Sequence, residues 1–222
     1  MLAYDSVVLD IDKFKDYDSE TLMSIVSEIG RLNEQEALSS NKIGDREGLR
    51  YITDGKEGPE VQTPDSYKSL YQIVRDSGYV GATMPLEYGG GGAPFTTAIL
   101  SGEIGIASNM AFYMGPGLSH GAMKTILKKA DDKLKETYLP KMISGEWMGT
   151  MCLTEPQCGT DLGLIKSSAT PLDDHYTLNG QKIWISFGEH DLTENIIHLV
   201  LARLPDAPDG IKGISLFLVP KR

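Results

Sequence analysis

Cysteine and histidine are scarce in this sequence. The 222 residues include two cysteines, Cys152 and Cys158, and four scattered histidines. Two cysteines are too few for a disulfide framework, and no spacing among these residues matches a zinc motif. We therefore expect free thiols in a reducing compartment and no bound metal.

Long apolar runs and an excess of positive charge are also missing. The longest apolar run, Ile196 to Ala202, has seven residues and contains His198, whereas a membrane-spanning helix needs about 20. The first five residues lack the basic start and apolar core of a signal peptide. The formal charge is 21 − 31 = −10, which argues against a nucleic-acid partner. We expect a cytoplasmic protein without a membrane span.

Several catalytic motifs are absent as well. No serine lies in a G-x-S-x-G motif, and neither cysteine has a protease signature around it. The run Gly89 to Gly92 lacks the lysine and hydroxyl of a P-loop, and Gly115-Pro116-Gly117 does not have dinucleotide-binding spacing. The glycine run therefore predicts a turn, with the wall of an active-site mouth as the alternative.

The first 145 residues have the apolar periodicity of helices. Asp18-Ser19 predicts a helix start, and Thr63-Pro64 predicts a cap followed by proline at the first helical position. The expected helices cover 19–32, 64–77, 95–108, 119–129 and 132–144, the last with a break at Pro140. The glycine- and charge-rich segment 40–62 predicts a loop.

Downstream of Glu146 the periodicity changes to two. The expected strands are 147–153, 166–170, 176–178, 181–185, 196–202 and 214–219. Asn179-Gly180 predicts a tight hairpin, and Asp173-Asp174 predicts a solvated hairpin turn. Helices followed by strands indicate an α+β fold. We predict an all-helical N-terminal domain, 1–145, followed by a small antiparallel β-barrel or sandwich, 146–222.

Two segments of the strand region have groups suited to a flavin. Residues 151–161 (MCLTEPQCGTD) leave a strand and enter a loop rich in hydroxyls and backbone N–H groups. Residues 182–186 (KIWIS) end a strand with an indole and a hydroxyl. An aromatic ring and a hydroxyl beside such a loop can pack on and hydrogen-bond a flavin ring. Ordinary sheet packing is the alternative interpretation.

Together these segments resemble the acyl-CoA dehydrogenase family. The resemblance includes Leu153-Thr154-Glu155-Pro156, Gly159-Thr160-Asp161 and the W-I-S motif, with Met84-Pro85 and the glycine run further upstream. It extends in order from about residue 19 to 219. Cys158 and Leu164 depart from the common signature, which normally has small residues there, and indicate changes in loop packing. The wording of 158–164, 188–191 and 204–208 is similar to the large 3-methylmercaptopropionyl-CoA dehydrogenase-like subgroup.

The resemblance implies FAD as the cofactor and an acyl-CoA as the substrate. By this likeness, FAD contacts come from two groups of residues: Met151, Leu153, Thr154, Gly159 and Thr160 on one side, and Trp184, Ile185 and Ser186 on the other. Thr160 would also lie near the CoA side of the pocket. We expect Glu155 to be structural, and Glu189-His190-Asp191 to form a solvated loop rather than a replacement base. No catalytic residue is assigned.

In this family the catalytic glutamate and the dimer-forming helices belong to a C-terminal helical domain, which the predicted elements do not include. The resemblance therefore predicts the N-terminal portion of a homo-oligomeric acyl-CoA dehydrogenase that passes electrons to electron-transfer flavoprotein. One alternative is a non-catalytic or split-enzyme module that binds flavin and acyl-CoA or pairs with a separate C-terminal half. Another is a relative that uses oxygen or a non-CoA substrate. We also expect an apolar face on the β domain to favour self-association.

Overall fold

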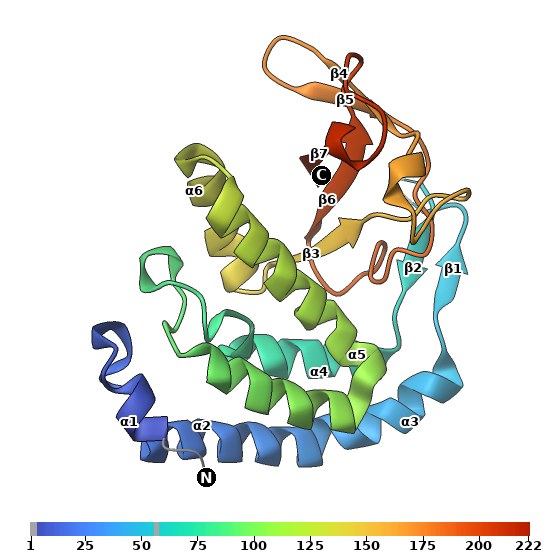
Figure 1. Cartoon of the computed structure of the whole chain (residues 1–222). Helices are drawn as coiled ribbons and strands as arrows, with labels where there is room; N and C mark the ends of the chain where they lie inside the picture. The colour runs from blue at the N-terminus through green and yellow to red at the C-terminus, as the bar shows by residue number, and fades with distance from the viewer. Residues whose placement is uncertain (1–3, 56–57) are drawn as a thin grey trace.

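The computed structural model describes residues 4–55 and 58–222, with helices first and a small sheet after them (Figure 1). The helices are α1 (Tyr4–Val8), α2 (Ser19–Leu32), α3 (Leu38–Glu47), α4 (Asp65–Asp76), α5 (Phe95–Lys129) and α6 (Asp132–Ile143). Short 3-10 helices are η1 (Asp12–Phe14), η3 (Tyr79–Gly81), η4 (Leu86–Tyr88), η5 (Leu162–Leu164) and η6 (Ile211–Gly213). Within the described ranges, no helix combines the length and apolarity that a membrane span requires.

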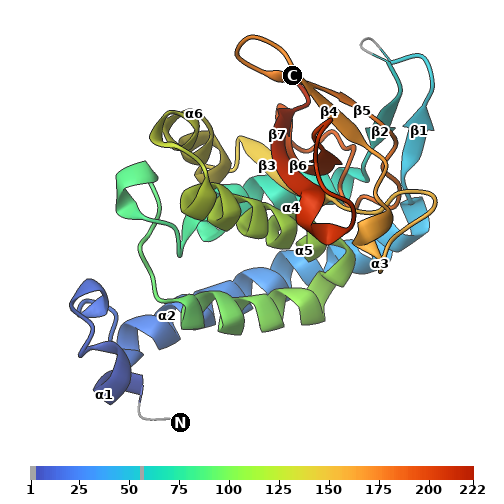
Figure 2. The ribbon, with the colours of Figure 1, turned by 45° about the horizontal axis from the view of Figure 1, so that its top comes forward.

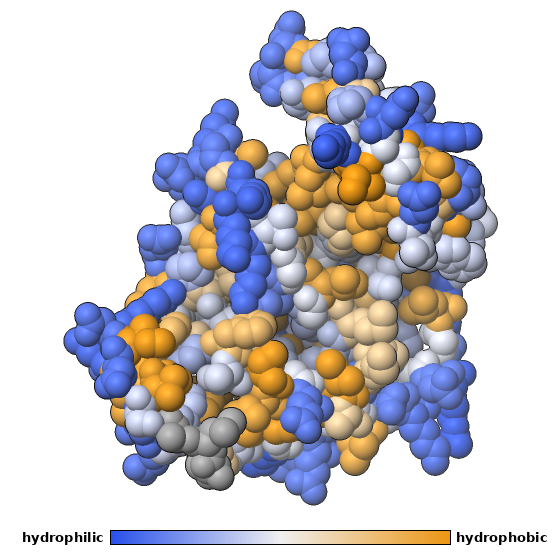
Figure 3. Space-filling view, in the orientation of Figure 1, coloured by the Kyte–Doolittle hydropathy of each residue, from blue (hydrophilic) through white to orange (hydrophobic). Residues whose placement is uncertain are grey.

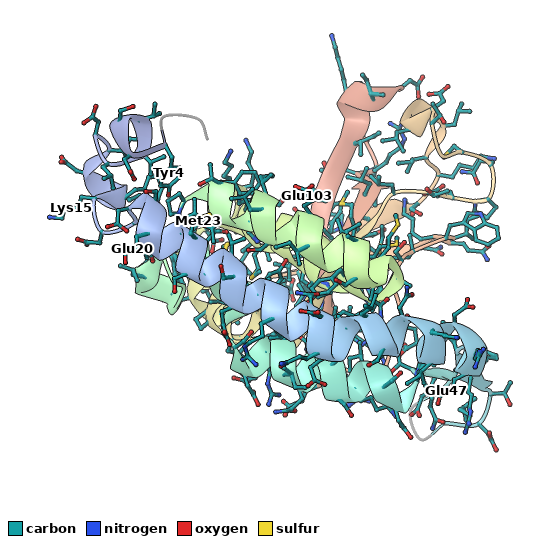
Figure 4. The ribbon with its side chains drawn as sticks, turned by 90° about the horizontal axis from the view of Figure 1, so that it is seen from below. Tyr4, Lys15, Glu20, Met23, Glu47 and Glu103 are labelled. Atoms are coloured by element: carbon teal, nitrogen blue, oxygen red, sulfur yellow. The ribbon has the colours of Figure 1, made fainter. Side chains whose placement is uncertain are left out.

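The helix α2 begins where the sequence predicts, because the Asp18 side chain accepts a hydrogen bond from the Thr21 N–H at 2.8 Å. A π-helical turn, Asn33–Ala37, joins α2 to α3 without a break. The two helices lie between α4 and the first half of α5 (Figure 4).

The predicted loop over 40–62 is wrong across most of its length. The helix α3 occupies its first part, and β1 (Arg50–Ile52) pairs antiparallel with β2 (Glu60–Gln62); residues 56–57 lie outside the described ranges. Position 44 of the helix is a glycine because α3 packs closely on α4 there. A Cβ at Gly44 would lie 2.3 Å from the ring of Tyr67. The glycine thus serves helix packing, which its sequence neighbourhood does not reveal.

The helix α4 starts one residue later than predicted. Pro64 is its N-cap, without a side-chain cap. The Thr63 hydroxyl instead donates to Asp191 Oδ1 at 2.6 Å. The threonine expected to cap α4 therefore connects this helix to the loop that contains Asp191.

The helix α5 consists of two halves that form a V (Figure 1). Asn109 lies at the vertex with φ −153° and ψ 82°. Its side-chain oxygen accepts the Phe112 N–H at 3.1 Å and so caps the second half. The predicted end near 108 is therefore confirmed, whereas the second helix begins nine residues earlier than expected and runs through Pro116.

The helix α6 is capped by Asp131, which accepts the Leu134 N–H at 2.9 Å. The predicted break at Pro140 is wrong, because the helix continues to Ile143. Leu139, Met142 and Ile143 are buried there, and their packing outweighs the hydrogen bond that proline cannot donate.

The second half has a five-stranded mixed sheet rather than an antiparallel barrel or sandwich. Its strands are β3 (Trp147–Cys152), β4 (Ser168–Pro171), β5 (Tyr176–Asn179), β6 (Asn195–Arg203) and β7 (Ile214–Pro220). β3 and β4 pair parallel with β6, whereas β7 pairs antiparallel with β6 and β5 with β4. The predicted order of a helical half followed by a small sheet half is confirmed.

The hairpin predicted at Asn179-Gly180 does not form. β5 pairs with β4, and the turn between them is closed by the Leu172 N–H and the His175 carbonyl at 2.8 Å. Asp173-Asp174 is thus the hairpin turn, as predicted. Residues 181–185 are irregular instead of forming a strand.

The core lies where α5 and α6 pack against β3 (Figure 2). Phe112, Met123, Met142 and Met148 are buried in it. In the view of Figure 3, apolar residues are also exposed across the middle of the molecule and at its lower left. Along α5 the exposed apolar residues follow a helical stripe: Phe95, Ile99, Ile106, Met110 and Met114. Exposed apolar residues therefore line part of the helical half, and the apolar face expected on the β domain stays a prediction.

Candidate functional site

The two segments with flavin-suited groups lie side by side. The Ile183 N–H donates to the Thr154 carbonyl at 3.0 Å. Lys182 Nζ donates to the Leu153 carbonyl at 3.0 Å and to Glu155 Oε1 at 2.8 Å. These contacts join segments that are about 30 residues apart in the chain. The fold therefore brings together the two segments that the sequence pattern indicated as suited to a flavin.

Glu155 holds this junction together from inside. The residue is 3% exposed. Besides Lys182, its carboxylate accepts the backbone N–H groups of Lys166 (2.8 Å) and Ser167 (3.1 Å) and the Gln157 amide at 2.6 Å. Burial alone would raise the pKa of Glu155, but these hydrogen bonds lower it to about 2. The carboxylate stays ionised and fully paired, which suits a structural role better than that of a base.

Trp184 is the most exposed aromatic residue at the junction. Its side chain is 86% exposed, and its backbone has φ 59°. Phe187 has φ 54°. Left-handed backbone is unfavourable for bulky residues, so the contacts around them must hold this segment in place. An exposed indole beside the loop gives a flat apolar face on which an aromatic ring can stack.

The other predicted flavin contacts surround the same junction. Thr154, Leu153 and Ile185 are half-buried, whereas Gly159 and Thr160 are exposed on the loop. Met151 packs partly into the core through β3. Donors, hydroxyls and an aromatic face are therefore all present at one accessible place, and this set fits a flavin.

A cavity of about 670 Å³ opens next to Ser186. Its wall also includes Phe187, Glu189 and His190 from the same segment. The helical half contributes the remaining side: Asn41, Lys42, Gly44, Asp45, Gly48, Leu49, Thr63, Pro64, Tyr67, Ala111 and Met114. This volume is in the usual range of ligand sites.

The cluster Glu189-His190-Asp191 is a loop, as we predicted, but it is solvated only in part, with Asp191 exposed and Glu189 half-buried. His190 is buried, and burial lowers its pKa to about 4. Asp191 accepts from the Thr63 N–H and hydroxyl and from Lys68 Nζ at 2.9 Å. Glu189 pairs with Lys221 at 2.5 Å. Thr63 and Lys68 lie far away in sequence, so these contacts could not be inferred from spacing.

The glycine run does not reach this site. The Gly90 N–H donates to the Pro85 carbonyl at 2.9 Å, and the Gly92 N–H to the Met84 carbonyl at 2.8 Å. A Cβ at Gly90 would lie 2.1 Å from the Met84 carbonyl oxygen. The run is a tightly packed turn, so the turn prediction holds over the active-site alternative.

Two family models match consecutive parts of the chain. Residues 54–146 match the acyl-CoA dehydrogenase N-terminal domain, and residues 150–222 match the acyl-CoA dehydrogenase middle domain. The chain belongs to the acyl-CoA dehydrogenase family. This confirms the resemblance that the two flavin-suited segments indicate.

Full-length family members extend well beyond these residues. The 3-methylmercaptopropionyl-CoA dehydrogenase of Ruegeria pomeroyi is 41% identical over 212 residues, which are 95% of this chain and 35% of that protein. A butyryl-CoA dehydrogenase of Syntrophomonas wolfei is 35% identical over 222 residues, 96% of this chain and 35% of that protein. The chain thus spans about a third of the length of these relatives.

The fold is shared with solved members of the acyl-CoA dehydrogenase family. The structure of the Bacillus anthracis acyl-CoA dehydrogenase complexed with FAD aligns with a TM-score of 0.72 at 23% identity, over 94% of this chain and 32% of that one. This likeness shows the arrangement of a helical half and a small sheet half.

Sequence reasoning missed Lys182 as the residue that joins the two segments. The signal was present, because the charged residues of 151–161, Glu155 and Asp161, are both acidic, and the one charged residue of 182–186, Lys182, is basic. It also missed the contacts of Asp191 with Thr63 and Lys68, for which no local signal exists.

Proposed function

We propose that this chain supplies the flavin- and acyl-CoA-binding half of an acyl-CoA dehydrogenase. The observation that carries the proposal is the junction of residues 153–155 with 182–183, which holds Trp184 exposed beside the loop. Membership of the acyl-CoA dehydrogenase family supports flavin as the group that binds at this junction. The two domains 1–145 and 146–222 would provide the two sides of the site.

Each predicted residue has a role in the proposal. Trp184 and Ile185 would pack on the flavin ring, and Ser186 would hydrogen-bond it. Thr154 and Thr160 would present hydroxyls from the opposite loop, with Thr160 also near the CoA. Met151, Leu153 and Gly159 would complete that side. Glu155 and Lys182 would keep the two sides at a fixed separation.

FAD, when bound, accepts the hydride that leaves the substrate β-carbon. The α-proton needs a base, and neither Glu155 nor Glu189 suits that task, because both are already paired with lysines. As the family resemblance implies, we assign the base to the C-terminal helical domain of the complete enzyme. The cavity beside Ser186 would take the acyl group, which its volume supports.

The partners follow from the same assignment. The electron acceptor would be an electron-transfer flavoprotein, and the complete enzyme would be a homo-oligomer. The exposed stripe on α5, with Phe95 and Ile106 among its residues, supports coverage by further protein.

The test is a titration of the purified protein with FAD, followed by flavin absorbance and fluorescence quenching. We expect saturable binding that weakens at least tenfold in Trp184→Ala and in Thr154→Val. Tyr176→Ala is the matched control, because this exposed aromatic residue lies on β5 and not at the junction. Equal affinity in all four proteins would reject the assigned site. Absence of binding in every protein would reject an autonomous half-site.

A further inference from the structure

A second cavity lies in the helical half, and its wall shares no residue with the cavity beside Ser186. Its volume is about 190 Å³, and it lies between α2, η3 and both halves of α5. Apolar side chains form much of its wall, including Ile29, Val80, Phe95 and Ile106. An apolar cavity needs no further explanation, but the remaining wall of this one is polar.

Four buried polar atoms of this wall have no hydrogen-bond partner. They are the hydroxyls of Thr83, Thr97 and Ser101 and Nε2 of His120. Thr97 and Ser101 are each only 1% exposed. Half of the eight such atoms in residues 4–55 and 58–222 therefore surround one cavity. Buried polar groups are normally paired, so this concentration requires a reason.

Three other hydroxyls of α5 are satisfied by their own helix. Ser108, Ser119 and Thr125 each donate to the carbonyl four residues earlier, at 2.8, 3.1 and 2.9 Å. Thr97 and Ser101 lie in the same helix α5 and make no such bond within the described chain. Their hydroxyls thus remain available to a molecule inside the cavity.

The wall also restricts the charge of that molecule. None of the residues lining the cavity is Asp, Glu, Lys or Arg. Burial lowers the pKa of His120, and Lys124 lowers it further, so the imidazole is neutral at physiological pH. A charged guest would find no counter-ion among the lining residues, which is unfavourable. Hydroxyls and a neutral imidazole both donate and accept, so they suit an uncharged hydrogen-bonding guest.

We propose that this cavity binds a small uncharged molecule with an apolar body and hydrogen-bonding groups at both ends. The volume corresponds to about six water molecules at roughly 30 Å³ each. A four-carbon diol has a similar number of non-hydrogen atoms. Thr97 and Ser101, one turn apart on α5, would bind one end, and His120 the other.

The probe for the test is butane-1,4-diol, titrated into the purified protein. Binding is followed by methyl NMR shifts of Thr97, Ile29 and Val80 and by the thermal midpoint. The double variant Thr97→Val with Ser101→Ala removes two hydroxyls at nearly constant volume. Thr125→Val is the matched control, because it removes a hydroxyl that is already bonded to its own helix. We expect saturable shifts in the wild type and control, and at least tenfold weaker binding in the double variant.

Three results would overturn the proposal. One is the absence of saturable shifts in the wild type together with a lower melting temperature of the double variant, because the hydroxyls then hold only water. Another is saturable binding of xenon without binding of the diol, because dry apolar cavities take xenon. The third is equal diol affinity in wild type and double variant. If the double variant does not fold, Ser101→Ala alone gives the same comparison.

Discussion

The ion pair between Lys182 and Glu155 offers the sharpest test of how the flavin-suited segments are held together. Replacing Lys182 with methionine keeps the length of the side chain but removes both of its hydrogen bonds. The pair is buried, with side chains 12% and 2% exposed. Breaking such a pair by removing one partner costs about 3–5 kcal/mol. Because Glu155 keeps three N–H donors, we expect a loss near the lower end, about 3 kcal/mol.

The pH dependence gives a second estimate, that of the stability contributed by the ionised Glu155 carboxylate with all of its hydrogen-bond donors. The pKa of Glu155 is about 2, against an ordinary value near 4.5. At about 1.36 kcal/mol per unit, this difference contributes about 3 kcal/mol to the free energy of unfolding. Because the folded-state pKa is lowered, this contribution is complete above about pH 4.5 and is lost as the pH falls towards 2. In Lys182→Met the pKa of Glu155 rises, so the acid-induced loss becomes smaller.

The assay is urea unfolding of the wild type, Lys182→Met, Glu155→Gln and the double variant at about pH 7 and at about pH 3, inside the window where the Glu155 contribution is lost. A coupling energy of about 2 kcal/mol or more is expected from the double-mutant cycle. Lys135→Met serves as the control, because its pair with Asp132 is at the surface and should add nothing measurable. A loss below about 1 kcal/mol in Lys182→Met, or an unchanged pH profile, would refute the reasoning.

Three further predictions address other positions. Trp184→Gly should leave the free energy of unfolding unchanged or raise it by up to about 1 kcal/mol, measured by urea unfolding, because the exposed indole packs on little and glycine relieves the positive φ. Asn109→Ala should destabilise by about 2–3 kcal/mol, because it removes the cap to Phe112 and bonds to Ser40 and Tyr67; a change below 1 kcal/mol would contradict this. Asp191→Ala should cost about 1–3 kcal/mol and increase hydrogen exchange at the start of α4; unaltered exchange there would count against it.

The elements that sequence analysis predicted correctly are those with local causes. Asp18 and Asp131 cap α2 and α6 through bonds to N–H groups three residues away. Asp173-Asp174 forms a hairpin turn that needs no distant partner. In each case the information lies within a few residues, so the pattern is sufficient.

The elements that it missed depend on distant contacts. Gly44 is helical because α4 approaches it closely, and Thr63 leaves its expected cap to bind Asp191, which is 128 residues away. The strand pairing has the same cause. β3 lies parallel to β6 although some 40 residues separate them, and no local pattern specifies that register. Such contacts are decided by packing and not by propensity.

The failed strand prediction at 181–185 bears on the site itself. The KIWIS segment has the β-branched and aromatic residues of a strand, yet Trp184 and Phe187 adopt left-handed backbone. Bulky residues reach this conformation only where the surroundings enforce it. Here the Ile183 bond to Thr154 on one side and the Gly188 N–H bond to the Ile185 carbonyl at 2.9 Å on the other enclose the segment.

A regular strand would put Trp184 and Ser186 on the same face with their neighbours paired. The irregular path instead leaves the indole exposed while Ser186 lines the cavity. Departure from the local preference thus puts the indole in solvent and Ser186 at the cavity, as the proposed flavin contact requires.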